Sequence, residues 1–378
     1  MKRSTISVHG AASPGAPGSA VVTPIDQSVT FVQQTGTGDG MMYAGSANTP
    51  TLQTVERKLA LLDGGEAAVV LSSGMAATAC GMLALLRPGD HLLSSSRVLG
   101  LTHALFMEEF AAMGIEVSLV DPMTPRMWRK ALRQTTRAIF VESPVNPTCR
   151  VIDLGPLANL AKSEGVALVV DSTLASPINF RPIEHGADVV IHSTTKYLNG
   201  HHDALGGAVI GTAPYVEEVR RKMMLWGQAP DAFAVWLLDR GLKTLDVRVT
   251  RQNESALALA RWCEARPEFA RVHYPGLVSH PDHEIAQQSL DGFGGMLAVE
   301  LAGGPEAAAR FLQQLALVTH APSLGGVDSL VSEPRFSSHR ELTSEQRTES
   351  GIPDGFLRLS VGIEDVTDLI ADFEQALR

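Results

Sequence analysis

Short runs of apolar residues, many of them β-branched, recur along the chain and predict buried strands. These runs span residues 67–71, 91–94, 138–141, 165–170, 187–191 and 207–210. A helical pattern extends from Thr51 to Leu62, and another extends from Asn253 to Ala265. Strands that alternate with helices are typical of an α/β protein with a largely parallel sheet.

Hydroxyl side chains and a lysine follow directly after the run at 187–191. Ser193, Thr195 and Lys196 stand where this strand is expected to end. Taken alone, a lysine in that place is most often a hydrated surface charge. Its neighbours favour another interpretation, because hydroxyl groups suit a phosphate oxygen and a lysine amine can hold pyridoxal phosphate as a Schiff base.

A carboxylate ends the preceding strand, since the run at 165–170 is followed by Asp171. Two successive parallel strands would bring Asp171 and Lys196 to the same edge of the sheet, where α/β folds bind ligands. Pyridoxal phosphate acts as an electron sink when a carboxylate keeps its ring nitrogen protonated, and Asp171 is a candidate for that partner. The alternative is a helix cap that follows a strand.

A turn of small residues, Ser72-Ser73-Gly74-Met75-Ala76-Ala77, lies between the strand at 67–71 and the helix expected after it. The free N–H groups and positive dipole at the start of a helix favour a phosphate. An ordinary tight turn has the same composition. Together with Lys196 and Asp171, however, the turn indicates a phosphate site.

Two segments carry a family resemblance: V-V-D-S-T-L-A-S-P around Asp171 and H-S-T-T-K-Y-L-N-G-H around Lys196. They resemble the Cys/Met-metabolism family of pyridoxal-phosphate enzymes, which includes cystathionine γ-synthase, cystathionine γ- and β-lyases and methionine γ-lyase. The resemblance implies the aspartate-aminotransferase-like α/β architecture called fold type I, with a mostly parallel sheet. It also implies an extended arm over 1–48, a cofactor-binding large domain over 49–247 and a smaller α+β domain over 248–378.

The same resemblance implies an assembly and assigns the cofactor contacts. The arm would reach a neighbouring subunit and bring Tyr43 to its site, in a homotetramer built as a dimer of dimers. Asn146, within E-S-P-V-N-P-T, would hydrogen-bond the ring hydroxyl oxygen. The remaining cofactor-binding positions implied by the resemblance are Ser73, Gly74, Met75, Asp171, Thr173, Ser193, Thr195 and Lys196.

A substrate site follows from two further matches. Arg358, within F-L-R-L-S-V-G, stands where the family binds the α-carboxylate of an amino acid. A guanidinium suits that role because its fork matches a carboxylate with two bonds. Ser323, within S-L-G-G-V-D-S-L, would contribute its backbone nearby. For Arg358 the alternative is a surface salt bridge.

Three positions depart from the family pattern. Gly45 stands where an arginine should help to bind the phosphate, and this removes a strong bidentate contact. Leu99 takes the place of the tyrosine that covers the cofactor ring and moves protons, which a leucine cannot do. Pro322 replaces a glutamate that is common in relatives acting on cystathionine.

Composition excludes several classes of protein. With 31 basic and 41 acidic residues, the net charge of −10 argues against a nucleic-acid partner. No apolar run is long enough for a membrane span, and the N-terminus lacks the apolar region of a secretory signal, so we expect a cytoplasmic protein. Cys80, Cys149 and Cys263 are widely spaced and suggest buried free thiols. We expect no metal.

The sequence therefore predicts γ-elimination or γ-replacement on a homoserine-, cystathionine- or methionine-like amino acid. Lys196, once displaced by the substrate, would remove the α-proton. One alternative is β-elimination of cystathionine or cysteine derivatives. Others are γ-chemistry on an unusual amino acid of specialised metabolism, and a catalytically weakened paralogue that binds the cofactor. The leaving group stays open.

Overall fold

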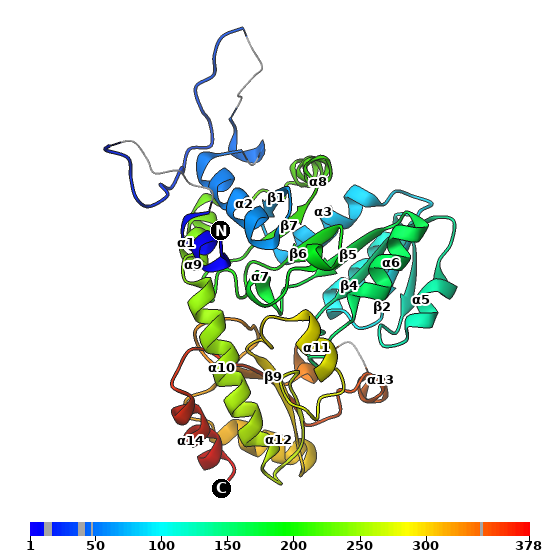
Figure 1. Ribbon diagram of the computed structural model, residues 1–378, viewed down its shortest axis with the longest axis vertical. Coiled ribbons are helices and arrows are strands. Elements are labelled where there is room, and N and C mark those ends of the chain that lie inside the picture. Colours follow the sequence, from blue (N-terminus) through cyan, green and yellow to red (C-terminus); the bar gives the residue numbers. More distant parts are fainter. Residues whose placement is uncertain (11–16, 37–41, 47, 341–342) are drawn as a thin grey trace.

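A seven-stranded sheet forms the centre of the larger part of the computed structural model, which describes residues 1–10, 17–36, 42–46, 48–340 and 343–378 (Figure 1). Its order is β1-β7-β6-β5-β4-β2-β3. The strands are β1 Ala67–Leu71, β2 His91–Ser95, β3 Glu116–Val120, β4 Thr136–Glu142, β5 Ala167–Asp171, β6 Val189–His192 and β7 Gly207–Gly211. Only β7 runs antiparallel to its neighbours, β1 and β6. This confirms the predicted α/β class with a mostly parallel sheet.

Helices cover both faces of this sheet because its strands are apolar on both sides. In β4, Phe140 packs in the core beneath α2, α3 and α8, whereas its neighbours Ile139 and Val141 pack in the core beneath α5 and α6. Because both faces of the sheet are buried, its strands appear in the sequence as continuous apolar runs. The helices are α2 Pro50–Asp63, α3 Gly74–Leu85, α5 Pro125–Ala131, α6 Leu154–Glu164, α8 Ala213–Trp226 and α9 Ala232–Leu242.

A second sheet of five strands, in the order β10-β11-β12-β9-β8, builds the smaller part of the molecule, which lies below the first in Figure 1. Its core includes Phe311 and Phe373, whose rings meet edge to face. The strands are β8 Phe269–His273, β9 Met296–Leu301, β10 Thr319–His320, β11 Leu330–Ser332 and β12 Phe356–Ser360. The main helices are α10 Leu245–Glu264, α12 Gly304–Gln314 and α14 Val366–Ala376.

The helix that connects the two parts begins earlier than predicted. Helix α10 begins at Leu245, eight residues before the predicted helix at Asn253, so the expected boundary at 247/248 falls inside it. The sequence analysis did not predict this part of the helix because polar residues occupy some of its buried positions. Arg248 and Gln252 are buried, and they donate hydrogen bonds to backbone oxygens, Arg248 to that of Tyr197 and Gln252 to that of Gly326.

The N-terminal segment also contains more structure than an extended arm. Arg3–His9 forms helix α1, in which Ile6 is buried in the core of the larger part. The predicted extended conformation is therefore wrong for residues 3–9. From 17 to 36 the chain has little regular structure, and the blue segment in Figure 1 projects from the body of the molecule.

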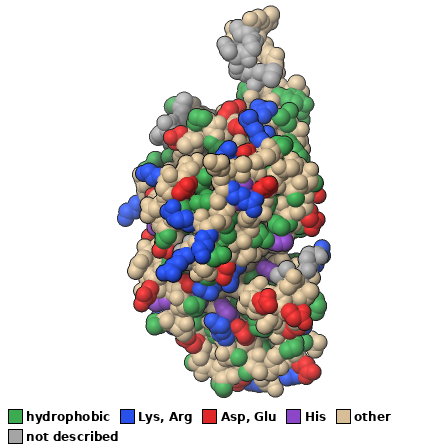
Figure 2. Space-filling model, turned by 90° about the vertical axis from the view of Figure 1, so that its right-hand side faces the viewer, with side chains coloured by type: hydrophobic (Ala, Val, Ile, Leu, Met, Phe, Trp, Pro, Cys, Tyr) green, Lys and Arg blue, Asp and Glu red, His purple; other side chains and the backbone are tan. Residues whose placement is uncertain are grey.

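Short elements complete the fold. They are α4 Gly100–Ala104, α7 Ser176–Asn179, α11 His283–Ser289, α13 Ser344–Glu349, η1 Ala44–Ser46, the π-helical η2 Leu105–Phe110, η3 Pro182–His185 and η4 Pro334–Phe336. Basic and acidic side chains are interspersed on the face shown in Figure 2. Within the described ranges every helix is too short or too polar to cross a bilayer, and the cytoplasmic location stays a prediction.

Candidate active site

A cavity of about 590 Å³ opens at the carboxyl ends of β4, β5 and β6. All predicted site residues except Tyr43 line it. They are Ser73, Gly74, Met75, Leu99, Asn146, Asp171, Thr173, Ser193, Thr195, Lys196, Ser323 and Arg358. The larger part supplies most of this lining, and Ser323 and Arg358 come from the smaller part. Sequence positions almost 300 residues apart therefore meet at one sheet edge, as parallel strands require.

The Lys196 amine faces this cavity from the loop that follows β6. It donates a hydrogen bond to the Ser323 hydroxyl at 3.0 Å. Burial lowers the pKa of this amine to about 8, and the charge of Arg358 acts in the same direction. More of the amine is therefore neutral near physiological pH than in an exposed lysine, which suits a nucleophile or a base.

Asp171 ends β5 at the floor of the cavity and is held by its neighbours. The Thr173 backbone N–H donates to its carboxylate at 2.9 Å. Thr173 also accepts the Ser193 backbone N–H at 2.9 Å. Thr173 thus orients Asp171 and connects it to the Ser193 loop. The sequence alone did not predict these two contacts.

A buried histidine stands behind this carboxylate. His192, the last residue of β6, places Nε2 3.1 Å from both carboxylate oxygens of Asp63. Burial opposes its protonation, but Asp63 and Asp171 outweigh this effect and raise the pKa of His192. The imidazolium in turn favours an ionised Asp171, although burial raises the pKa of that carboxyl group overall.

The predicted phosphate-binding turn lies at the start of α3. The Ser73 side chain caps the helix by accepting the Ala76 N–H at 3.1 Å. The N–H groups of Gly74 and Met75 lie in the first turn, where a helix offers no carbonyl partner. A side-chain carbon at Gly74 would come within 2.8 Å of Ser193, so glycine allows this helix end to lie against the loop that carries Lys196.

Thr195 is tied to a backbone neighbour instead of standing free over this turn. Its hydroxyl donates to the Gly206 oxygen at 3.2 Å and accepts the Gly206 N–H at 3.1 Å. In this structure its hydroxyl proton is therefore used by the Gly206 backbone oxygen. Of the two predicted hydroxyl groups, Ser193 is the one that lies beside Gly74.

Arg358 is a buried cation, and among the described residues no carboxylate lies within ion-pairing distance of it. Its guanidinium donates to Asn146 Oδ1 at 3.1 Å and to the Ser323 backbone oxygen at 2.9 Å. Burial lowers its pKa to about 10, which leaves it charged at neutral pH. A buried charge without a counter-ion is costly, so the geometry calls for an anionic ligand.

Ser323 connects the two cationic groups, and its backbone is strained. Its φ of 103° lies in a region that residues with a side chain rarely adopt. The conformation directs the hydroxyl to Lys196 and the carbonyl oxygen to Arg358. Strain of this kind is held by surrounding structure at functional sites.

Glu142 is a site residue to which the sequence analysis gave no role. It ends β4 beside Asp171, lines the cavity and is only 5 % exposed. It accepts the Leu99 backbone N–H at 2.7 Å. Burial raises the pKa of Glu142 to about 8, and the Asp171 carboxylate adds to this. The available signal was its place at the end of an apolar run, as for Asp171.

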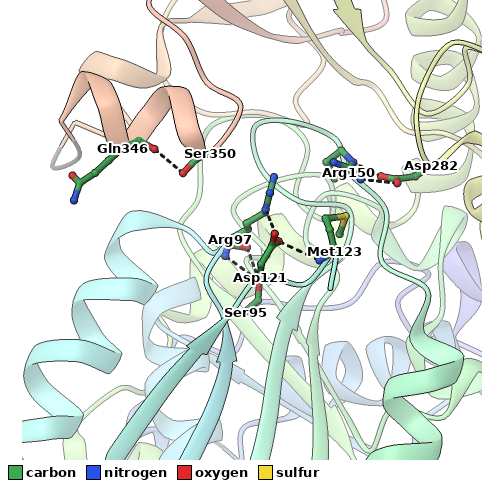
Figure 3. A network of polar contacts seen from close by, with 8 residues as sticks. All are labelled: Ser95, Arg97, Asp121, Met123, Arg150, Asp282, Gln346 and Ser350. Carbon is green, nitrogen blue, oxygen red and sulfur yellow. Dashed lines mark hydrogen bonds and ion pairs between the residues drawn. The ribbon is translucent and has the colours of Figure 1, made fainter. Parts of the chain in front are cut away.

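Hydrogen bonds fix the loop that brings Leu99 over the cavity. Arg97 donates from its backbone to Ser95 Oγ at 3.0 Å and from Nε to Asp121 at 3.1 Å, and Asp121 also accepts the Met123 N–H (Figure 3). The loops after β2 and β3 are thereby joined.

A second pair in Figure 3 joins the two parts of the molecule close to Asn146. The Arg150 guanidinium donates two hydrogen bonds to the carboxylate of Asp282, at 2.5 and 2.9 Å. The Val151 N–H donates to the same carboxylate. These contacts thus connect the two parts of the molecule.

Tyr43 does not line the cavity of its own chain and is 46 % exposed. A side-chain carbon at Gly45 would come within 2.7 Å of the Tyr43 ring. With the Tyr43 ring in this position, an arginine side chain at position 45 would collide with the ring. The predicted contribution of Tyr43 to a neighbouring subunit stays a prediction.

Comparison with known proteins shows the family of the chain. The model of the Cys/Met metabolism PLP-dependent enzymes matches residues 4–378. The chain belongs to this family. It is 41% identical over 374 residues to cystathionine beta-lyase of Coxiella burnetii, covering 98% of this chain and 96% of the relative. It is 38% identical to L-methionine gamma-lyase of Pseudomonas putida, covering 99% and 96%.

A solved structure shows the same fold. Cystathionine gamma synthase from Xanthomonas oryzae pv. oryzae, in complex with aminoacrylate and cysteine, aligns with a TM-score of 0.96 and 36% identity, covering 100% of this chain and 98% of that chain. The recognised family and the pyridoxal-phosphate cofactor are confirmed. Because the relatives carry out different reactions, membership does not select one of them.

The residues of this family member fit the cofactor. Lys196 offers an amine of lowered pKa, the first turn of α3 offers N–H donors without helical partners, and Asp171 offers a carboxylate at the end of the neighbouring strand. This donor set matches an aldehyde, a phosphate and a ring nitrogen. Lys196, the 73–75 turn, Ser193, Asn146 and Asp171 would hold the group.

Glu142 should give the cofactor-free enzyme a stability that falls with rising pH. Below pH 8 the folded state keeps a proton that the unfolded chain releases above about pH 4.5, so stability declines between these values by up to about 1.4 kcal/mol per pH unit. We expect Glu142→Gln, which keeps an acceptor for Leu99, to reduce this slope in denaturant titrations between pH 5 and 8. Equal slopes for both proteins would contradict the assignment.

Proposed function

We propose that this fold-type-I enzyme catalyses γ-elimination or γ-replacement on a homoserine-, cystathionine- or methionine-like amino acid. The observation that carries the proposal is the pairing of Arg358 and Lys196 across Ser323. A buried guanidinium without a carboxylate partner would take the substrate α-carboxylate. It would thereby place the α-carbon beside an amine that can accept a proton.

The residues would act in a fixed order. Arg358 binds the α-carboxylate through its fork, with Asn146 and Ser323 holding the guanidinium in place. Lys196 Nζ would then take the α-proton and, after releasing it, a proton from the β-carbon, whose electron pair would allow the γ-substituent to leave. Asp171, oriented by Thr173, holds a proton on the ring nitrogen. When bound, pyridoxal phosphate supplies the electron sink for these proton transfers.

β-Elimination is the second candidate function, because the relative with 41% identity is a cystathionine beta-lyase. The same Arg358 and Lys196 serve both reactions, since both begin with loss of the α-proton. The two differ in which carbon loses its substituent. Cystathionine separates them: γ-elimination gives cysteine and 2-oxobutanoate, and β-elimination gives homocysteine and pyruvate, each with ammonia.

We expect mass spectrometry of the cofactor-loaded enzyme to detect γ-products. The substrates are cystathionine, methionine, cysteine and O-acylhomoserines, each with and without an added thiol. An oxo acid and ammonia without thiol would define a lyase, and a thioether formed only with thiol would define a synthase. Lys196→Ala should lower turnover by about a thousandfold, because it removes the proton acceptor.

The matched control is Lys222→Ala, a lysine on α8 away from the cavity. Turnover retained by Lys196→Ala would contradict the mechanism. Pyruvate and homocysteine from cystathionine would establish β-elimination instead.

Leu99 marks adaptation to a particular substrate, because Lys196, Asp171 and Arg358 are all present. Leu99→Tyr should therefore lower kcat/KM for the best substrate by about tenfold, since the larger ring reduces the space in the cavity. Leu99→Met conserves volume without a phenol and should change kcat/KM less. A large gain for Leu99→Tyr on common substrates would instead support the weakened-paralogue alternative.

We also propose a homotetramer in which the arm completes a neighbour's site. Exposed apolar side chains on the arm support it, for in a single chain Val21 is 98 % and Val32 102 % exposed. Such residues are normally covered in the assembled protein. Light scattering should give the mass of four chains, and a monomer at assay concentration would contradict the assembly.

A further inference from the structure

The loop that follows β4 reaches from the larger part of the molecule to the smaller part and carries Asn146. Two backbone hydrogen bonds close its base. The Val145 N–H donates to the Arg150 oxygen, and the Cys149 N–H donates to the Val145 oxygen, both at 2.8 Å. Cys149 has a φ of 54°, in the left-handed region, so the chain turns back sharply at this residue. Asn146 therefore lies at the tip of a short, closed loop.

The buried amide of Asn146 has a defined direction. Its Oδ1 accepts a hydrogen bond from the Arg358 guanidinium at 3.1 Å. Because a guanidinium only donates, the amide oxygen must face it, and the amide NH2 group points to the other side. In the predicted site this group would donate to the ring hydroxyl oxygen of the cofactor. A displacement of Asn146 would therefore disturb both the cofactor contact and the guanidinium.

An ion pair holds the base of this loop on the smaller part. Arg150 donates from Nε and Nη2 to the two oxygens of Asp282, at 2.5 and 2.9 Å, and the Val151 N–H donates to Asp282 at 2.9 Å (Figure 3). Asp282 lies between β8 and α11, and its side chain is only 6 % exposed. Three donors from one loop thus converge on a buried carboxylate, and hydrogen bonds of this kind are the strong ones.

The same loop contacts the sheet that carries Arg358. The Cys149 thiol donates to the Met296 oxygen on β9 at 3.5 Å. Strand β9 pairs with β12, in which Arg358 lies opposite Ala298. Because a thiol is a weak donor, the bonds to Asp282 are the stronger attachment. The smaller part thus holds both the loop and the guanidinium that the loop tip contacts.

We propose that Arg150 and Asp282 are positioning residues that set the place of Asn146 against Arg358 and thereby the affinity for the α-carboxylate of the substrate. This inference rests on the proposed function, because that function assigns the carboxylate to Arg358. Neither member of the pair is among the described residues that line the cavity, so the pair acts through the loop. Small displacements of groups that hold a substrate weaken its binding and slow its reaction.

Two substitutions test the pair. In Asp282→Asn an NH2 group faces one of the three donors, so at least one hydrogen bond is lost and the loop shifts. KM for the best substrate should rise about tenfold, and kcat should fall less, because Lys196 and Asp171 are held by other contacts. Arg150→Lys keeps the charge but not the paired geometry, so it should give an intermediate KM. It also tests the pair if Asp282→Asn does not fold.

A second buried arginine–carboxylate pair provides the matched control. Glu56 accepts two hydrogen bonds from Arg220, at 3.2 and 2.8 Å, and one from the Val70 N–H at 3.1 Å, and its side chain is 8 % exposed. Neither Glu56 nor Arg220 belongs to the described lining of the cavity. Glu56→Gln should lower the thermal stability, as Asp282→Asn does, but leave KM unchanged. An equal rise of KM in both variants would overturn the proposal.

Binding of an inert amino acid separates this inference from the proposed reaction. L-Norleucine has an α-carboxylate but no leaving group. Calorimetry should show that it binds the wild-type holoenzyme and Glu56→Gln equally well, and Asp282→Asn about tenfold more weakly. If this order appears but no γ-substituted amino acid is turned over, the proposed reaction fails and the role of the pair stands. If substrates react and all three proteins bind L-norleucine equally, only the role of the pair fails.

Discussion

The buried charge of Arg358 is the constraint on which the site depends. A guanidinium removed from water needs partners, and it finds neutral ones in Asn146 of the larger part and Ser323 of the smaller part. These contacts hold the two parts at the cavity, with the Arg150–Asp282 pair close by. Their neutrality is what leaves the positive charge for a ligand. An acidic partner from the chain would stabilise the protein more but would occupy the substrate's place.

The rest of the electrostatics follows from this charge and from burial. Arg358 adds to the desolvation that lowers the pKa of Lys196, so in the proposed mechanism one group would bind the substrate and also help to prepare the base. On the floor, Asp171 and Glu142 end adjacent strands, and the charge of the Asp171 carboxylate adds to the burial that raises the pKa of Glu142. His192 favours the ionised form at Asp171, which leaves the proton on Glu142. The neutral Glu142 is then available to hold the Leu99 backbone.

The sequence could locate residues that stand at the ends of apolar runs. Lys196 and Asp171 were found in this way because strand order brings such ends to one edge, and the helix start at Ser73 follows from turn composition. Arg358, Asn146 and Ser323 came from motifs of the family. Glu142 was missed although it ends a run, since only packing shows that it shares a site with Asp171. The start of α10 was missed because its polar residues are buried through backbone partners, which no pattern of hydrophobicity records.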